Sequence, residues 1–294
     1  MKKAFLQLHI AVLLAGFTGV LGRLITLNEG LLVWYRLMIS AISLWIIALL
    51  ARQPIRIKAA DLLRIFGIGA IPALHWVTFY GSIKAANVSI ALVCFSSIGF
   101  FTALFEPMFF RVRINLRELV LSLIAVAGIC FIFHFDPAFK KGIIIGLFSA
   151  LLGSTFPILN KKLLRSIDAP VVTLYELSGG FLFLSLILPV YLKYAPAGHF
   201  IPTPQDLFWL LILALCCTVL AFNLSMRALK KISAFTVNLS YNLEPLYGII
   251  LAFLIYREDK SMNSGFYIGL FMIVVSVALQ SWLVASSFSH QKKI

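Results

Sequence analysis

The sequence is divided into apolar blocks of about 18–25 residues, separated by short joints that carry charge, proline or glycine. A helix rises 1.5 Å per residue, so each block is long enough to cross a hydrocarbon core about 30 Å thick. The 294 residues are 61% apolar and 12% charged, whereas soluble domains hold about 45–50% apolar and about 25% charged residues. Lipid is therefore the solvent that this sequence requires, and we expect an all-α membrane protein.

The apolar blocks predict ten transmembrane helices. Their expected ranges are 6–27, 31–51, 63–83, 88–110, 116–133, 142–160, 170–191, 207–226, 234–256 and 264–286. We interpret the first block, which follows Lys2 and Lys3, as a retained helix and not as a secretory signal, because it is long and lacks a small-residue cleavage pattern. No joint is large enough to hold a separate soluble domain.

The basic residues predict the orientation of the chain. With the N-terminus placed in the cytoplasm, 17 Lys and Arg residues lie on that side, 7 lie on the other, and Arg36 lies within a helix. Short cytoplasmic loops carry such an excess of Lys and Arg. We therefore expect a multi-pass protein of the plasma (inner) membrane with both termini in the cytoplasm. The same distribution accounts for the net charge of +14 without a nucleic-acid partner.

The two halves of the chain show weak internal similarity. Segment 81–85 (GSIKA) ends the third predicted helix much as 224–228 (LSMRA) ends the eighth. Segment 34–37 (WYRL) lies early in the second helix much as 174–177 (LYEL) lies early in the seventh. Because five is an odd number, a second copy of five helices enters the membrane in the opposite orientation. The sequence therefore predicts two inverted five-helix repeats, a common plan of secondary transporters.

With these junctions, the chain resembles the drug/metabolite transporter superfamily and, within it, the EamA-type ten-helix permeases. The residues that carry the resemblance are 241–248 (YNLEPLYG), 256–258 (YRE) and the Gly269-Leu270 pattern of the last helix. In that family a proline in the ninth helix is followed about a dozen residues later by a Glu at the helix end. Pro245 and Glu258 match this layout.

The resemblance implies a first EamA-like repeat over 1–137 and a second, inverted one over 138–294. It also implies alternating access and the export of a metabolite or amino acid, driven by the solute gradient or by protons. The first half departs from the pattern, because its proline comes late, as Pro107, and no Glu corresponds to Glu258. Some relatives couple transport to protons through an acidic residue in the first helix. The first predicted helix of this chain holds no acidic residue.

Ionisable residues within a bilayer are candidate functional sites, because each costs about 2.5–3.5 kcal/mol to insert. Four fall inside the predicted helices: Arg36, Glu106, Glu176 and Glu244. Glu244 lies 13 residues from Lys231 and 13 from Arg257, or roughly 20 Å from each along the helix axis. It is therefore expected at the midplane of the membrane.

The ninth predicted helix carries one polar face, formed by Asn238, Tyr241, Asn242 and Glu244. Pro245 has no N–H, so it leaves a backbone carbonyl free on this face. We expect the face to line a cavity that binds substrate or protons. The alternative is a seam of hydrogen bonds between helices, which small polar residues also form.

The third predicted helix places His75 near the same depth, with Trp76 and Tyr80 beside it. A His/Glu pair at one depth could hold and release a proton. A packed histidine bonded to a carbonyl is the equal alternative. Tyr80 and Asn223 occupy corresponding positions of the two repeats, and we expect them at the same cavity.

The other charged residues are candidate gate charges. Arg36 and Glu176 each lie roughly 9 Å below opposite rims, which leaves about 12 Å of depth between them and argues against a static salt bridge. For Arg36 the alternative is snorkelling to the rim. Glu106 lies near one membrane surface, where pairing with Arg111 or Arg113 is the simpler interpretation.

The sequence shows no Walker loop, no metal-ligand cluster and no nucleophile–base spacing. We therefore predict a secondary, non-ATP transporter and not an enzyme, with no cofactor or metal. A small-molecule substrate and the lipid bilayer are the expected partners, proton coupling stays open, and we expect the monomer to be functional. The alternative is a membrane-embedded enzyme or receptor that uses the same cavity without transport.

Overall fold

The computed structural model describes residues 2–53, 55–135, 137–241 and 243–291. Every regular element in these ranges is helical. The α-helices are α1 (Lys2–Gly16), α2 (Thr18–Leu24), α3 (Glu29–Leu50), α4 (Ala59–Ala85), α5 (Val88–Phe95), α6 (Ile98–Phe110), α7 (Leu116–Phe135), α8 (Lys140–Leu163), α9 (Ala169–Tyr194), α10 (Pro204–Ala214), α11 (Ala221–Leu229), α12 (Ala234–Tyr241), α13 (Glu244–Tyr256) and α14 (Ser264–Gln291). A π-helical turn, η2 (Leu215–Leu220), joins α10 to α11, and the 3-10 turns are η1 (Pro137–Phe139) and η3 (Glu258–Ser261).

Seven segments of the described chain are long and apolar enough to cross a membrane. They are Lys2–Leu24, Glu29–Leu50, Ala59–Ala85, Val88–Phe110, Lys140–Leu163, Ala169–Tyr194 and Pro204–Leu229. Two shorter apolar helices, Glu244–Tyr256 and Ser264–Leu279, follow them. The all-helical class is therefore confirmed, while the count of ten membrane crossings stays a prediction.

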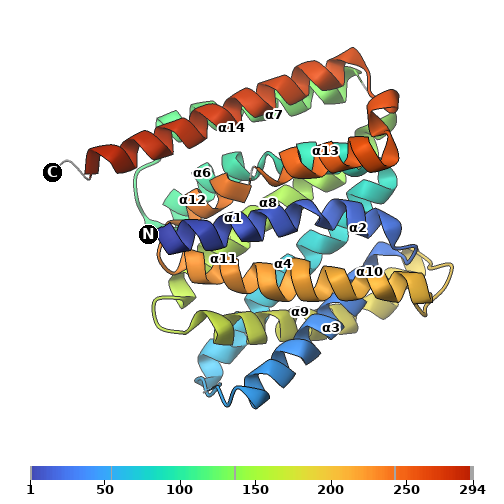
Figure 1. Cartoon of the computed structure of the whole chain (residues 1–294), viewed down its shortest axis with the longest axis vertical. Helices are drawn as coiled ribbons and strands as arrows, with labels where there is room; N and C mark the ends of the chain where they lie inside the picture. Colours follow the sequence, from blue (N-terminus) through green and yellow to red (C-terminus); the bar gives the residue numbers. More distant parts are fainter. Residues whose placement is uncertain (1, 54, 136, 242, 292–294) are drawn as a thin grey trace.

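The helices form a bundle in which α1 and α2 occupy the middle (Figure 1). α14 lies along α7 at one edge, and α3 lies against α9 at the opposite edge (Figure 1). α4 packs against both α8 and α9, and α1 packs against α11. Helices from the two halves of the sequence are thus interleaved, and the large apolar core is shared between them.

Several segments predicted as single helices are interrupted. The first is broken at Phe17, the fourth between Phe95 and Ile98, and the ninth between Tyr241 and Glu244. The Ser97 hydroxyl and the Ser97 backbone N–H both donate to the Cys94 carbonyl (2.7 and 3.1 Å), so a local turn closes the second break. Interruptions of this kind place non-helical backbone inside the bundle, where it can line a buried cavity.

Glycines permit the closest helix crossings. A Cβ at Gly69 of α4 would lie 2.2 Å from the Glu176 carbonyl oxygen, and one at Gly180 of α9 would lie 2.7 Å from the Gly69 carbonyl oxygen. Both contacts are with backbone, which has little freedom to move aside. Small residues let membrane helices approach in this way and gain dispersion energy that side chains would block. This crossing fixes α4, which carries three residues of the cavity described next.

Candidate substrate cavity

A cavity of about 70 Å³ lies in the centre of the bundle. Its wall is formed by α1, α2, α3 and α4, the α5–α6 break, α8, η2, α11, α12 and the first residue of α13. The lining residues are Ala15, Thr18, Arg36, His75, Trp76, Phe79, Phe95, Ile98, Gly153, Phe156, Pro157, Cys217, Ala221, Phe222, Ser225, Met226, Leu229, Asn238, Tyr241 and Glu244. The cavity is therefore mostly aromatic and aliphatic, with a few polar groups placed around it.

Arg36 is the most constrained polar group of the wall. Its side chain is only 1% exposed, Nε donates to Thr218 Oγ1 (2.7 Å) and Nη1 donates to the Tyr80 hydroxyl (2.8 Å). The guanidinium carbon lies 3.9 Å from the centre of the Trp76 ring. Within the described part of the chain Arg36 forms no ion pair with a carboxylate. The structure thus holds a buried cation in a fixed orientation at the cavity.

Thr218 owes its position to the π-helical turn. Its hydroxyl donates to the Leu213 carbonyl five residues earlier (2.8 Å) while it accepts from Arg36. An i→i+5 turn shifts the following residues around the helix axis, and such turns are frequent at functional sites. Sequence reasoning missed Thr218, because nothing in an apolar run signals a π turn.

Glu244 lies where the predicted ninth helix is broken. It opens α13, is 6% exposed, and interacts with Thr18 and with the positive charge of Arg36. A carboxylate in the first turn of a helix is stabilised by the unpaired N–H groups there. Arg36 and Glu244 therefore place opposite charges in the wall of one cavity, without forming a direct salt bridge.

His75 also lines the cavity. Its Nδ1 lies 2.9 Å from the Ser149 carbonyl oxygen and 2.8 Å from the Ser149 hydroxyl. The ring centre of Phe95 lies 5.3 Å from that of His75. His75 is thus bonded to a carbonyl, as a packed histidine is, and it contributes to the cavity wall as well.

The polar face predicted for the ninth helix is divided between the cavity and its surroundings. Asn238 and Tyr241 line the cavity; Asn238 Nδ2 donates to Thr102 Oγ1 (2.8 Å), and its buried Oδ1 has no protein partner among the described residues. Asn242 lies outside the described residues. An unpaired buried acceptor is costly, so Asn238 Oδ1 is available to a donor on a solute or a water molecule.

The remaining predicted residues surround the cavity at different distances. Tyr80 supports Arg36 but is not part of the lining, whereas Trp76 is. Asn223 lies outside the lining and donates to the Val219 carbonyl (3.2 Å). Glu176 is fully buried away from the cavity and accepts from Asn160 Nδ2 at 3.0 and 2.8 Å.

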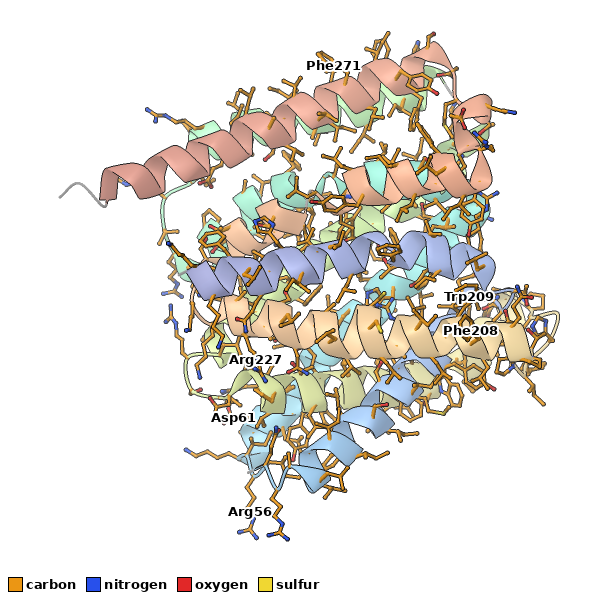
Figure 2. All side chains as sticks on the ribbon, viewed as in Figure 1. Arg56, Asp61, Phe208, Trp209, Arg227 and Phe271 are labelled. Carbon is orange, nitrogen blue, oxygen red and sulfur yellow. The ribbon has the colours of Figure 1, made fainter. Side chains whose placement is uncertain are left out.

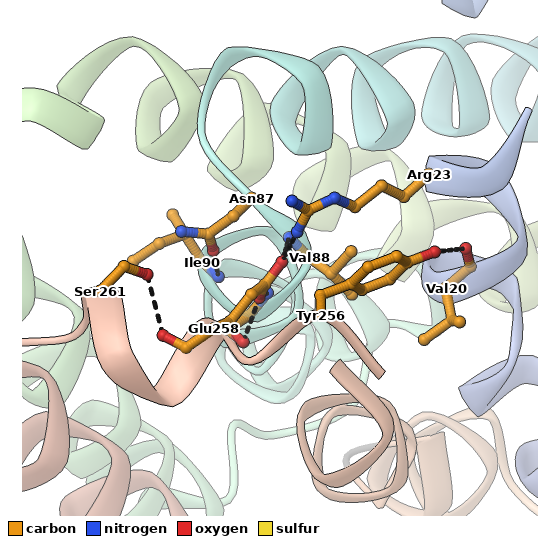
Figure 3. Close-up of polar contacts among 9 residues, drawn as sticks. Val20, Arg23, Asn87, Val88, Ile90, Tyr256, Glu258 and Ser261 are labelled. Carbon is orange, nitrogen blue, oxygen red and sulfur yellow. Dashed lines mark hydrogen bonds and ion pairs between the residues drawn. The ribbon is translucent and has the colours of Figure 1, made fainter. Parts of the chain in front are cut away.

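One end of the bundle is tied by a carboxylate (Figure 3). Glu258 is 4% exposed and forms an ion pair with Arg23 at the end of α2. Its oxygens also accept from the backbone N–H groups of Val88 (3.1 Å) and Ser89 (2.9 Å) at the start of α5. We call Arg23, Val88, Ser89 and Glu258 the carboxylate latch. It connects α2, α5 and η3, the turn that follows α13, and the helices α2, α5 and α13 each contribute a residue to the cavity lining.

The opposite end is tied by backbone carbonyls. Lys161 near the end of α8 donates to the carbonyl oxygens of Leu229, the last residue of α11, and of Ile232 in the turn that follows. The negative charge of Glu106 on α6 acts on the same lysine. We call Lys161, Leu229 and Ile232 the carbonyl latch. Arg23 and Lys161 occupy corresponding places, each near the end of the first long segment of its half.

Residues 2–134 and 140–282 each match the model of the EamA-like transporter family. The chain belongs to this family. Both EamA domains contribute to the cavity wall, the first through Arg36 and His75 and the second through Glu244. The drug/metabolite transporter resemblance of the sequence is thereby confirmed.

Relatives of this EamA protein bear similar descriptions. A protein of Haemophilus influenzae described as an uncharacterized transporter is 22% identical over 276 residues, covering 87% of this chain and 86% of the relative. An uncharacterized transporter of Synechocystis is 22% identical over 213 residues, covering 67% of this chain but only 59% of its own length. A solved structure, described only as the crystal structure of a protein, shares the fold with a TM-score of 0.68 and 18% identity, over 96% of this chain and 98% of that one.

Proposed function

We propose that the protein is a secondary transporter that exports a small metabolite or amino acid by alternating access around the central cavity. The observation that carries this proposal is the pair Arg36 and Glu244, two buried charges in one cavity wall contributed by the two EamA domains. Charges in a membrane-embedded chain are costly, and they commonly mark solute and ion pathways. The family and the names of the relatives support transport over catalysis.

The small volume of the cavity supports a transport cycle in which the protein changes conformation. Sites for drug-sized ligands enclose about 300–1,000 Å³, whereas this cavity encloses about 70 Å³. A metabolite therefore fits only when the surrounding helices separate. We interpret the structure as a closed state, from which either end of the bundle opens in turn.

The packing of the helices supports the inverted repeat on which this motion depends. If 1–137 and 138–294 are equivalent, α4 corresponds to α10–α11 and α8 corresponds to α1–α2. The close packing of α4 on α8 then has its counterpart in that of α11 on α1. The breaks in the two halves also correspond. The α5–α6 and α12–α13 interruptions are each followed by a 13-residue helix, and the residue after each helix is an arginine with positive φ, Arg111 or Arg257.

The two latches supply a reason for the closed state. Opening one end of the cavity separates Arg23 from Glu258, and opening the other separates Lys161 from the α11–α12 turn. The 17-to-7 distribution of basic residues supports cytoplasmic termini, so the carboxylate latch faces the outside and the carbonyl latch faces the cytoplasm. When either end opens, the charge-assisted hydrogen bonds of its latch are then replaced by hydrogen bonds to water.

Solute flux tests the proposal directly. Metabolites and amino acids are first screened for those that raise the thermal stability of the purified full-length chain. The chain is then reconstituted in liposomes loaded with the unlabelled solute, and uptake of the same solute in labelled form is followed. Counterflow that depends on the protein supports a secondary transporter. Binding or chemical turnover without flux, measured on the same preparation, contradicts the proposal and favours a receptor or an enzyme.

A further inference from the structure

A second hollow, separate from the central cavity, lies at the end of the bundle where α1 begins. It encloses about 300 Å³ between the start of α1, the start of α9 and the end of α11. Its lining residues are Lys3, Gln7, Asp168, Ala169, Pro170, Arg227, Lys230 and Lys231. Half of these residues are cations, so the chemistry of the hollow is that of an anion site.

The positive charge of the hollow is only partly neutralised by the protein. Asp168 is its acidic residue and pairs with Lys230 (2.8 Å). Lys3, Arg227 and Lys231 form no ion pair with any carboxylate of the described chain. Three cations around one hollow repel each other unless an anion or water lies between them.

An apolar strip runs from this hollow along α1. Leu6, Ile10 and Leu13 are 62%, 40% and 47% exposed. Their i, i+4, i+7 spacing places them on one face of α1, and this strip begins one turn after Lys3. The end of this membrane helix thus presents a cationic pocket followed by an exposed apolar strip. These two parts are complementary to the anionic headgroup and the apolar acyl chain of a phospholipid.

We propose that the hollow binds the phosphate headgroup of an anionic phospholipid, whose acyl chain lies along the Leu6, Ile10 and Leu13 strip of α1. Basic pockets between helix ends recognise anionic headgroups in this way. The hollow is shared by both EamA domains, with α1 in the first and α9 and α11 in the second. A lipid bound there ties α1 to α11, both of which line the central cavity, and so holds this end of the bundle together.

The test uses the full-length protein in nanodiscs of phosphatidylcholine, alone or with phosphatidylglycerol. Retained lipid is counted by native mass spectrometry, and the thermal unfolding temperature is measured in parallel. The hollow variant is Lys3→Gln with Arg227→Gln and Lys231→Gln. The matched control is Arg56→Gln with Lys58→Gln and Arg64→Gln, which removes the same charge from exposed residues elsewhere. Figure 2 shows Arg56 well apart from Arg227.

We expect phosphatidylglycerol to bind wild type and control equally and to raise both unfolding temperatures. The hollow variant should bind it at least tenfold more weakly, since each cation contributes independently. Equal loss in the control variant would show general surface electrostatics and overturn the proposal. Binding of inorganic phosphate or glycerol phosphate as tightly as the lipid would overturn it in favour of a soluble anion.

Folding of the variants is checked in phosphatidylcholine alone, where all proteins should unfold at the same temperature. If the triple variant does not fold, the single variants Lys3→Gln and Lys231→Gln decide the question, because both side chains are exposed. Each should weaken retention of phosphatidylglycerol severalfold. Unchanged retention in both overturns the proposal. Solute flux is not a readout here, so a failed transporter assignment leaves the result intact.

Discussion

The guanidinium carbon of Arg36 lies 3.9 Å from the centre of the Trp76 ring, and both side chains belong to the wall of the central cavity. A cation over an indole face, away from water, is stabilised by about 2 kcal/mol or more. Two hydrogen bonds, to Thr218 and Tyr80, fix the same group. Arg36 is therefore oriented before any solute arrives, which favours recognition of a carboxylate or another planar anion.

The first prediction concerns this orientation. Arg36→Lys keeps the positive charge but loses the planar fork, so the stack on Trp76 and one hydrogen bond disappear. We expect the initial rate of flux in proteoliposomes to fall at least tenfold, equivalent to about 1.4 kcal/mol. The matched control is Arg165→Lys, since Arg165 also lies over an aromatic ring, 5.7 Å from that of Phe110, but outside the cavity. Equal rates in the two variants would refute a role in recognition.

The second prediction concerns the buried carboxylate. Glu244→Gln keeps the volume and much of the hydrogen bonding while it removes the charge. If Glu244 binds protons or a cationic group of the solute, flux should collapse although the protein still folds and inserts. Glu118→Gln on α7 is the control, because that side chain bonds locally to Asn115. Undiminished, still pH-dependent flux in Glu244→Gln would show that this residue serves only packing.

The third prediction concerns the carboxylate latch. Glu258→Gln removes the ion pair with Arg23 and weakens the bonds to the start of α5. We expect this end of the cavity to open more often. Cys217 in the cavity wall reports the change after Cys94, Cys130 and Cys216 are replaced by serine.

The measurement is the rate at which a membrane-impermeant thiol reagent labels Cys217 from the latch side. We expect an increase of about tenfold, equivalent to about 1.4 kcal/mol, because the hydrogen bonds from Arg23 and from the start of α5 lose the negative charge that strengthens them. Asp259→Asn is the control, since it removes the neighbouring charge and leaves the latch in place. Labelling that rises equally in both variants, or in neither, would exclude a gating role for Glu258.

The fourth prediction concerns the crossing of α4 and α9. Gly69→Ala places a Cβ against the Glu176 carbonyl oxygen, and we expect a loss of about 1–3 kcal/mol in the free energy of unfolding. Gly67→Ala, two residues away on the same helix, meets no atom within 4 Å. There the better helix propensity of alanine should leave stability equal or higher. Thermal unfolding in detergent compares the two, and a Gly69→Ala protein as stable as Gly67→Ala would show that the crossing can relax.

The sequence predicted the helices well because each depends on a local quantity, the length of an apolar block. The breaks were missed, because the interruption at Ser96-Ser97 falls inside one long apolar block, and the length of the block does not locate it. Pro245 signalled that the ninth helix was special, but not that α13 would begin at Glu244. Propensity alone does not predict such interruptions.

The candidate site shows the same division. Depth along the helix axis suggested Glu244 and His75, and both line the central cavity, while their part in binding stays a prediction. Arg36 was considered as a gate charge because its Cα lies near a predicted rim, but its long side chain reaches Thr218 and Trp76. Which residues the Arg36 side chain contacts depends on which helices lie beside α3, and a single sequence does not give the neighbours of a helix. A gating role for Arg36 and Glu176 stays a prediction.

The two latches differ in chemistry, and this difference distinguishes one end of the bundle from the other. The carboxylate latch joins two side-chain charges, one of which, Arg23, is 40% exposed, so salt in the medium competes with it directly. The carbonyl latch joins the charge of Lys161 to neutral backbone carbonyls. Salt therefore screens no attraction between two side-chain charges there. Ionic strength on one side of the membrane should therefore shift the balance between the two open states, whereas the same change on the other side should have less effect. Under the proposed alternating access, a chain of two EamA domains would respond to salt in a directional way through these two contacts alone.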